Sequence, residues 1–407
     1  MSRPTASTTE EITRLVRESV GPVASARTLP AECYYSPDFY EFERDAIFGR
    51  SWLFLCHESQ VPLPGDHLPV TVAAEPLLVT RGRDAQVHVV SAVCQHRGFV
   101  ITDPGLGSDG TVTDEVTSTR HLRCPYHFWT YDFDGRLTSA PSMSDTHELD
   151  ALKATICLPK MRVEIWHGLI FANQDPDAAP LAPTVQAADA AITPYRLEDM
   201  VVAETVTLTD LPFNWKNMQE NALEEYHTTY VHKGFHENVP ANLVEHGSFE
   251  PGDGAVYRHA GMIIPGGQPV PGRPTFPVIE GLPEYERGQF LFLSIPPLLF
   301  AAVRPDGVKM FRIVPQAVDR ISLTIMFLFP RTTLELPDFA ALLQRQVDLI
   351  PLIDQPDIDS NTRMFTGLRS KFAPRGPFSP QESSLPQFNQ WLLDRYSAAS
   401  EPETVDA

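Results

Sequence analysis

The sequence has little that suits a secreted, membrane or nucleic-acid-binding protein. Its 407 residues include only 5 cysteines, an odd number that does not suit a disulfide framework. Lys and Arg number 32 against 52 Asp and Glu, and the net charge of −20 argues against nucleic acid or an anionic membrane as partner. The longest apolar run, residues 290–303, is too short for a bilayer span and is interrupted by Pro296-Pro297. We therefore expect a cytoplasmic protein with reduced thiols.

The pattern of residues along the chain changes near residue 175. Residues 52–170 alternate short apolar runs with turns, which predicts a small all-β unit. The Pro- and Ala-rich segment 175–184 is the best candidate boundary, and beyond it patterns typical of strands and helices are mixed. The chain is thus predicted to be α+β, with a largely antiparallel sheet in its second domain. We expect a helical segment at 1–44 that packs on the second domain, a β domain at 45–174 and the second domain itself at 175–407.

Two mixed pairs of cysteine and histidine stand in the predicted β unit. Cys94 and His96 form one pair, and Cys124 and His127 form the other. Structural zinc sites usually group like ligands together, whereas a [2Fe–2S] cluster with two thiolates and two imidazoles takes mixed pairs. The spacing therefore favours an iron–sulfur cluster over zinc, and over two coincidental pairs.

A second group of possible metal ligands lies in residues 213–232, FNWKNMQENALEEYHTTYVH. His227 and His232 are five residues apart, about 500° of rotation on a regular helix, so a distorted helix is required if both bind one metal. Two histidines and a carboxylate form the facial triad of non-haem iron oxygenases. Taken alone, the residues favour a helix whose histidine face is merely polar.

The two Cys/His loops resemble those of the Rieske family. The strings CQHRG and CPYHFWTYDFDGRL are similar to its two cluster-binding loops, with two departures. Phe128 stands where the family usually has glycine, and residues 105–120 form an insertion relative to the family pattern. The string NWK…EN…E-x-YH…H is similar to the iron-binding segment of catalytic (alpha) subunits of Rieske non-haem iron oxygenases of the aromatic-ring-hydroxylating type. The resemblance covers residues 35–396.

This resemblance implies two metal centres, in a Rieske domain and in a catalytic domain with a helix-grip-like sheet. The [2Fe–2S] cluster would be held by Cys94, His96, Cys124 and His127. The mononuclear Fe(II) would be held by His227, His232 and Asp357. Asp357 is chosen over the competing aspartates because its distance from Gly367-Leu368 fits the family pattern; the competitors are Asp348, Asp354 and Asp359.

The resemblance also implies a homotrimer in which Glu224 relays electrons between subunits. In the family, an acidic residue at this position bridges a cluster histidine of one subunit and an iron-binding histidine of its neighbour. Glu225 is expected to be a solvated helix carboxylate. Tyr126 and Trp129 are expected to pack at the subunit contact.

The function implied is that of the terminal oxygenase component of a multicomponent Rieske oxygenase, an oxidoreductase with O2 as co-substrate. No G-x-G-x-x-G motif follows a predicted strand, so electrons from NAD(P)H are expected through a separate reductase, a ferredoxin, or both. Hydroxylation of an aromatic, possibly carboxylated, small molecule is favoured, and monooxygenation or N-demethylation of a quaternary or tertiary amine is the alternative. An electron-transfer protein without oxygenase activity and a zinc-stabilised binding module are alternatives of other classes. Candidate pocket residues lie within 255–304: Arg258, Arg273, Phe276, Phe290, Phe292, Phe300 and Arg304.

Overall fold

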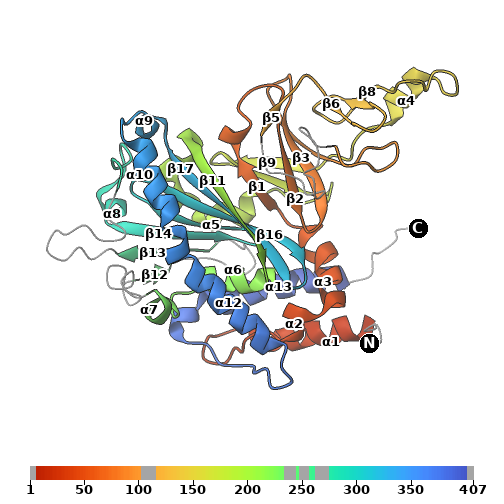
Figure 1. The fold of residues 1–407 in the computed structure, drawn as a ribbon. Coiled ribbons are helices and arrows are strands. Elements are labelled where there is room, and N and C mark those ends of the chain that lie inside the picture. The colour runs from red at the N-terminus through yellow and green to blue at the C-terminus, as the bar shows by residue number, and fades with distance from the viewer. Residues whose placement is uncertain (1–5, 102–115, 233–243, 247–255, 262–274, 401–407) are drawn as a thin grey trace. The chain divides into compact units, whose positions relative to one another are not determined.

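The computed structural model describes residues 6–101, 116–232, 244–246, 256–261 and 275–400. The chain divides into two compact units (Figure 1). Arg50–Ala179 form one, called the β unit below; Met1–Gly49 and Pro180–Ala407 together form the other, the α+β unit. Residues 105–115, most of the predicted insertion, lie outside the described residues.

The β unit contains three small antiparallel sheets among its described residues. Their orders are β1-β10-β9, β4-β3-β2-β5 and β6-β7-β8. Gly135, with a φ of 89°, makes the turn between β7 and β8 that Asp134-Gly135 predicts. The strands are β1 (Leu53–His57), β2 (Asp66–Val72), β3 (Glu75–Arg81), β4 (Val87–Ser91), β5 (Thr117–Ser118), β6 (Leu122–Arg123), β7 (Thr130–Tyr131), β8 (Leu137–Ser139), β9 (Arg162–Trp166) and β10 (Leu169–Asn173), and the one α-helix described here is α4 (Leu149–Thr155).

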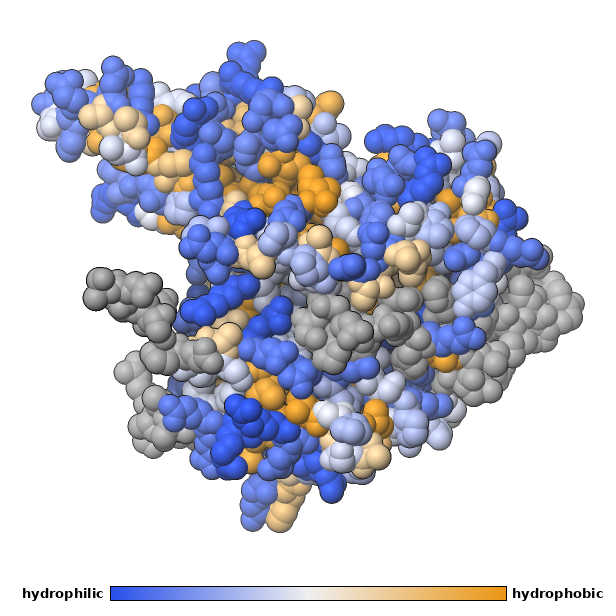
Figure 2. Space-filling model, turned by 180° about the vertical axis from the view of Figure 1, so that it is seen from behind, coloured by the Kyte–Doolittle hydropathy of each residue, from blue (hydrophilic) through white to orange (hydrophobic). Residues whose placement is uncertain are grey.

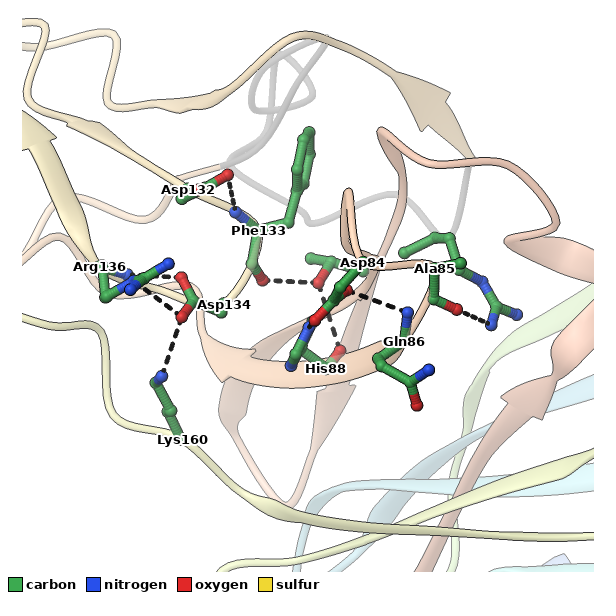
Figure 3. Close-up of polar contacts among 11 residues, drawn as sticks. Asp84, Ala85, Gln86, His88, Asp132, Phe133, Asp134, Arg136 and Lys160 are labelled. Carbon is green, nitrogen blue, oxygen red and sulfur yellow. Dashed lines mark hydrogen bonds and ion pairs between the residues drawn. The ribbon is translucent and has the colours of Figure 1, made fainter.

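Side-chain contacts hold the β7–β8 turn, which follows the second Cys/His pair (Figure 3). The hydroxyl of Thr80, a fully buried residue of β3, donates a hydrogen bond to the carbonyl of Phe133 at 2.7 Å. At the same turn, Asp134 forms ion pairs with Arg136 at 2.9 Å and with Lys160 at 3.3 Å. These contacts join the β7–β8 turn to β3 and to the segment before β9.

The α+β unit is built on a seven-stranded antiparallel sheet with the order β11-β17-β16-β15-β14-β13-β12. The inner strand β17 is mostly apolar and is buried along nearly its whole length, whereas the edge strand β11 carries Glu and Thr and is half exposed. This confirms the predicted α+β class. The strands are β11 (Met200–Leu211), β12 (Val244–His246), β13 (Val256–Gly261), β14 (Gln289–Ile295), β15 (Leu299–Arg304), β16 (Gly307–Ala317) and β17 (Arg320–Pro330).

Helices from both ends of the chain and from its middle pack in this unit, and α6 contacts β16, α12 and α13. None of the described helices is long and apolar enough to cross a membrane. The face seen in Figure 2 is largely hydrophilic, with apolar residues gathered in small patches. The α-helices are α1 (Ala6–Val16), α2 (Glu32–Tyr35), α3 (Pro37–Glu43), α5 (Ala182–Ile192), α6 (Trp215–Leu223), α7 (Thr228–Val231), α8 (Glu284–Arg287), α9 (Arg331–Leu334), α10 (Phe339–Asp348), α11 (Ile350–Ile353), α12 (Gln355–Leu368) and α13 (Ser384–Ser400).

A buried ion pair fixes α6 within the unit. Lys216 of α6 and Glu43 of α3 are both fully buried, and the ammonium donates to the two carboxylate oxygens at 2.8 and 2.7 Å. Glu43 also accepts hydrogen bonds from Trp215 and from Tyr396 of α13. Removal of one partner of such a pair costs about 3–5 kcal/mol, because the other charge is left buried and unpaired. The helix that leads to the predicted iron ligands is therefore rigidly anchored.

Candidate metal centres

The two Cys/His loops of the β unit make the same backbone hydrogen bonds. The N–H groups of Cys94 and Gly98 donate to the carbonyls of Phe99 and Cys94, both at 2.9 Å. In the second loop, the N–H groups of Cys124 and Phe128 donate to the carbonyls of Trp129 and Cys124, at 2.9 and 3.0 Å. Each turn needs a left-handed residue four positions after its cysteine, and these are Gly98 (φ 73°) and Phe128 (φ 58°). For a residue with a side chain this conformation costs about 1–2 kcal/mol.

These turns bring together the four residues predicted to hold a cluster. Cys94 and Cys124 are buried, and their thiols lie within hydrogen-bonding range of each other. The rings of His96 and His127 lie 4.7 Å apart. Two thiols on the inner side and two imidazoles nearer the surface are the donor set that a [2Fe–2S] cluster with two cysteine and two histidine ligands requires.

The surroundings of these residues suit a bound cluster. Burial raises the pKa of the Cys124 thiol, so a metal's positive charge is needed to stabilise the thiolate. Burial, together with the neighbouring His127 and Arg97, lowers the pKa of His96 and favours the neutral imidazole that binds metal. The Tyr131 hydroxyl lies 3.3 Å from the Cys94 sulfur. Trp129 is buried and stacks on His96, with ring centroids 4.7 Å apart, so the expectation that it packs at a subunit surface is wrong.

The chain leaves the helix before the two iron-site histidines, not between them. Helix α6 begins at the N-cap Asn214 and ends at Leu223, because Glu224 is extended, with φ −131° and ψ 159°. After this break, one short helical turn, α7, separates His227 from His232. The two histidines stand at the two ends of this turn and both reach one site, so the distortion predicted between them lies instead before His227.

His227, His232 and Asp357 converge into one group whose ligand atoms all lie within 4.8 Å of one another. The nearer oxygen of Asp357 is 3.4 Å from Nε2 of His227 and 2.9 Å from Nε2 of His232. Asp357 lies in the first turn of α12, where the helix dipole favours a negative charge. Two imidazoles and one carboxylate fit a mononuclear Fe(II) with open positions.

The three competing aspartates have other partners. Asp354 forms an ion pair with Lys309 at 2.6 Å. Asp348 and Asp359 accept hydrogen bonds from glutamines four residues earlier on the same stretch of helix, at 2.9 and 2.8 Å.

Asn221 of α6 and Glu224, the residue that follows this helix, form hydrogen bonds with the triad. Glu224 is hydrogen-bonded to Nδ1 of His227 and also accepts from the His227 backbone N–H at 3.1 Å. Asn221 donates to the Asp357 oxygen at 3.3 Å. Asn221 was missed as a site residue, although it belongs to the quoted EN pair, because spacing alone does not show that α12 passes beside α6.

The charges of the triad are strongly coupled. Burial would lower the pKa of His227, but hydrogen bonds to Asp357 and Glu224 outweigh it and raise the pKa to about 9. Burial would raise the pKa of Asp357, but hydrogen bonds from His227 and His232 lower it to about 2. A metal ion that takes the imidazole nitrogens must therefore displace a proton from this cluster.

Beside the triad lies a cavity of about 820 Å³. Of the predicted pocket residues, Arg258, Phe290, Phe292, Phe300 and Arg304 line it. Phe276 does not, and packs instead against Phe329 and Phe339; Arg273 lies outside the described residues. Phe311, Phe327 and Phe329 add further aromatic walls.

Among the described residues that line the cavity, every Lys and Arg has a carboxylate partner. Arg258 pairs with Glu225 at 3.2 Å, Arg304 with Asp306 at 2.8 Å, and Lys309 with Asp354 at 2.6 Å. Two of these cations also cover ring faces: Arg258 lies 4.9 Å from the centroid of Phe292, and Lys309 lies 5.0 Å from that of Phe311.

The expectation that Glu225 is solvated is wrong, since its side chain is only 6% exposed. The break after Leu223 turns it inward toward Arg258, which a regular helix would not do. This change of course is not visible in the sequence pattern.

Comparison with known proteins agrees with this arrangement. Residues 51–156 match the Rieske [2Fe-2S] domain, and residues 197–398 match the catalytic domain of ring hydroxylating alpha subunits. The chain belongs to the Rieske oxygenase alpha-subunit family. This confirms the resemblance stated above, together with a [2Fe–2S] cluster and a mononuclear non-haem iron as the family's cofactors.

Relatives within the family act on different substrates. The chain is 30% identical over 223 residues to the carnitine monooxygenase oxygenase subunit of Escherichia coli (strain K12), a match covering 54% of this chain and 56% of that protein. It is 31% identical over 258 residues to the alpha subunit of benzene 1,2-dioxygenase of Pseudomonas putida, covering 61% and 53%. The chain thus spans about half the length of the curated relatives that it matches.

The fold is shared over nearly the whole chain. Naphthalene 1,2-dioxygenase from Rhodococcus sp. superposes with a TM-score of 0.80 and 22% identity, covering 96% of this chain and 99% of that one. A quaternary ammonium Rieske monooxygenase in complex with L-carnitine gives 0.73 and 20%, covering 97% and 100%.

Proposed function

We propose that the protein is the terminal oxygenase component of a multicomponent Rieske oxygenase, and that it hydroxylates an uncharged, aromatic small molecule. The observation that carries the substrate class is the cavity beside the triad. Its walls are rich in phenylalanine, and its described cations are already neutralised.

A charged substrate would have to compete with the chain's own pairs. A carboxylate would displace Glu225, Asp306 or Asp354 from a buried or half-buried cation, and breaking such pairs is costly. A quaternary ammonium would compete with Arg258 and Lys309 for the faces of Phe292 and Phe311. An apolar ring needs neither exchange, and its burial is favourable in proportion to the apolar area covered.

The side chains around the two centres have distinct roles in this proposal. When bound, the [2Fe–2S] cluster and Fe(II) supply one-electron transfer and O2 activation. Cys94, His96, Cys124 and His127 would hold the first, and His227, His232 and Asp357 the second. Glu224 accepts the Nδ1 proton of His227 and so fixes the tautomer whose Nε2 faces Asp357.

We further propose that Glu224 joins this histidine to a cluster histidine of a neighbouring subunit in a homotrimer. A carboxylate can accept hydrogen bonds from two imidazoles, which gives a short coupled path. Electrons would come from NAD(P)H through a cytoplasmic reductase, a ferredoxin, or both, because no dinucleotide-binding motif is predicted in the sequence.

The test is O2 consumption coupled to product formation by the reduced, iron-loaded protein. The panel contains uncharged aromatic rings, aromatic acids and methylated amines, with Asp357→Ala as the inactive control. Uncharged rings should be turned over with the highest kcat/KM. Preferred turnover of an aromatic acid would overturn the substrate class, and no turnover of any compound would favour an electron-transfer protein.

Hydroxylation or N-demethylation of a quaternary amine is the second candidate. It is favoured by the similarity to carnitine monooxygenase rather than by the cavity. O2 consumption matched by product formation with methylated amines, and with no other compound of the panel, would establish it.

A further inference from the structure

The ion pair between Arg258 and Glu225 is held differently from the other two pairs at the cavity. The other two cations donate hydrogen bonds to their carboxylates, at 2.6 to 2.9 Å. Nε of Arg258 lies 3.2 Å from the Glu225 carboxylate, but it makes no hydrogen bond within the described part of the chain. Both side chains are nevertheless buried, with exposed fractions of 7% and 6%. The attraction of two buried charges, rather than a hydrogen bond at Nε, therefore holds this contact.

The pair lies where the cavity meets the iron ligands. Arg258 belongs to β13, and its Nη2 donates to the carbonyl of Ala222, in the last turn of α6, at 3.0 Å. Glu225 follows the break after this helix and stands two residues before His227. Both side chains line the same cavity as the triad. A substrate group that took the place of either side chain would thus lie in the cavity where the reaction is proposed to occur.

The Arg258 guanidinium makes the two contacts that a small alkylammonium ion would need. Its Cζ lies 4.9 Å from the ring centroid of Phe292, within range of a cation–π interaction. Its Nε faces the Glu225 carboxylate. Phe292 also stacks on Phe290, with ring centroids 5.9 Å apart, so the covered ring belongs to the aromatic wall of the cavity. An aromatic face and a carboxylate form a subsite for a cation, and a side chain of the protein itself occupies it.

The Glu225 carboxylate, in turn, takes the place of an anionic ligand. A buried guanidinium suits a planar carboxylate, because its N–H donors match the two carboxylate oxygens. Arg258 would offer such a subsite to an aromatic acid if Glu225 did not already neutralise it. One ion pair therefore fills a subsite for each sign of charge.

We propose that Glu225 and Arg258 are specificity-determining residues: Glu225 keeps anionic substrates, and Arg258 keeps cationic substrates, out of the cavity. The inference rests on the proposed function, because it names the residues that reserve the cavity for uncharged rings. Loss of either partner changes the charge that the cavity accepts.

The test measures ligand binding to the iron-loaded protein without oxygen, so that it does not depend on turnover. The anionic probe is benzoate, compared with its uncharged analogue benzamide. The cationic probe is phenyltrimethylammonium, compared with its uncharged analogue tert-butylbenzene. In the wild type, neither ion should bind more tightly than its uncharged analogue.

The two single variants should change this preference in opposite directions. Glu225→Ala should bind benzoate at least about tenfold more tightly than the wild type does, since hydrogen bonds to a charged group contribute this much or more. Glu225→Gln keeps an acceptor oxygen beside Arg258 and should gain less; it serves if the alanine variant does not fold. Arg258→Ala should bind phenyltrimethylammonium more tightly, because the Phe292 face and the carboxylate become available. Affinity for the uncharged analogues should change little.

Two further variants are controls. The double variant, Glu225→Ala with Arg258→Ala, lacks both charges and should bind neither ion more tightly than the wild type does. Asp359→Ala removes one exposed negative charge outside the cavity and should leave all four affinities unchanged. An equal gain of benzoate affinity in Asp354→Asn, which weakens the pair of Lys309, would show that any cation of the cavity suffices and would overturn the assignment to Arg258.

The outcomes separate this inference from the proposed function. Unchanged benzoate affinity in folded Glu225→Ala and Glu225→Gln, or unchanged phenyltrimethylammonium affinity in folded Arg258→Ala, would overturn the inference. A wild type that shows these shifts in its variants but turns over no compound would refute the proposed oxygenase and leave the pair assigned. In an active enzyme, Glu225→Ala should lower the KM for an aromatic acid more than it changes kcat.

Discussion

The two candidate metal centres are built in different ways. The cluster site depends on backbone hydrogen bonds: two turns with the same pattern present ligands that are 33 residues or fewer apart in sequence. The iron site depends on side chains, since Glu224 and Asn221 orient ligands from α7 and α12 that are more than 100 residues apart. Removal of one ligand from the loop site should therefore abolish cluster binding and leave the rest of the protein intact. At the iron site, changes of different charged residues should have effects of different size on iron binding and electron transfer.

The largest expected effect is at the cluster. Cys94→Ser should remove the red-brown colour and the reduced-state EPR signal of a His-ligated [2Fe–2S] cluster, because a hydroxyl does not replace a thiolate ligand. Mononuclear iron should stay bound in the α+β unit, which iron analysis would show. A colourless wild-type protein that contains zinc would contradict the cluster assignment.

Asp357→Ala should remove the mononuclear iron and leave the cluster in place. We expect the cluster spectrum to persist, about one iron per chain to be lost and oxygenation to be abolished, because the triad loses its only carboxylate. Asp354→Asn is the control: it weakens the pair with Lys309 but should retain the iron. Loss of iron from Asp354→Asn and not from Asp357→Ala would show that the ligand is misplaced.

Glu224→Gln should have a smaller effect. An amide cannot accept two imidazole N–H donors symmetrically, because its nitrogen is itself a donor. Both metal sites should stay occupied while cluster re-oxidation in a single turnover slows by about 10–100-fold, the usual effect of losing a partner of a metal-binding histidine. Glu225 is unsuitable as a control because it is buried against Arg258, so Asp359→Asn, at an exposed position of α12, serves instead. Wild-type kinetics in a fully loaded Glu224→Gln protein would refute the relay.

The smallest effect concerns Glu220, which lies next to Asn221 on α6. Burial raises its pKa to about 7, although a hydrogen bond from Tyr34 and the charge of Lys216 oppose the shift. Because the folded pKa is raised, the contribution of this carboxyl to stability is complete below about pH 4.5 and is lost as the pH rises through 7.

Glu220→Gln should therefore remove about 1–3 kcal/mol of the pH dependence of the free energy of unfolding between pH 5 and 8. Urea unfolding of the α+β unit across this range would measure it. If the free energy of unfolding depended on pH in the same way in the wild type and in Glu220→Gln, Glu220 would have an ordinary pKa.

Much of this organisation could be predicted from the sequence. The α+β class, the antiparallel sheet and the two groups of ligands follow from apolar patterns, turn residues and short-range spacing. The geometry of a 3.6-residue turn required a distorted helix between His227 and His232, but the break falls before both histidines, at Glu224. The choice of Asp357 rested on a family pattern, and that assignment remains a prediction.

Other features were decided by tertiary structure. Side-chain burial depends on which segments pack together, so Glu225 turned inward to Arg258 and Trp129 inward to His96 against expectation. The pairing of every described cation at the cavity likewise depends on strands and helices that are distant in sequence. Local patterns determine which residue types are available, but contacts between distant elements determine which charges are neutralised and which rings remain exposed. The sequence by itself therefore determined the class of chemistry, whereas only the tertiary structure decided the character of the substrate cavity and the pairing of its charges.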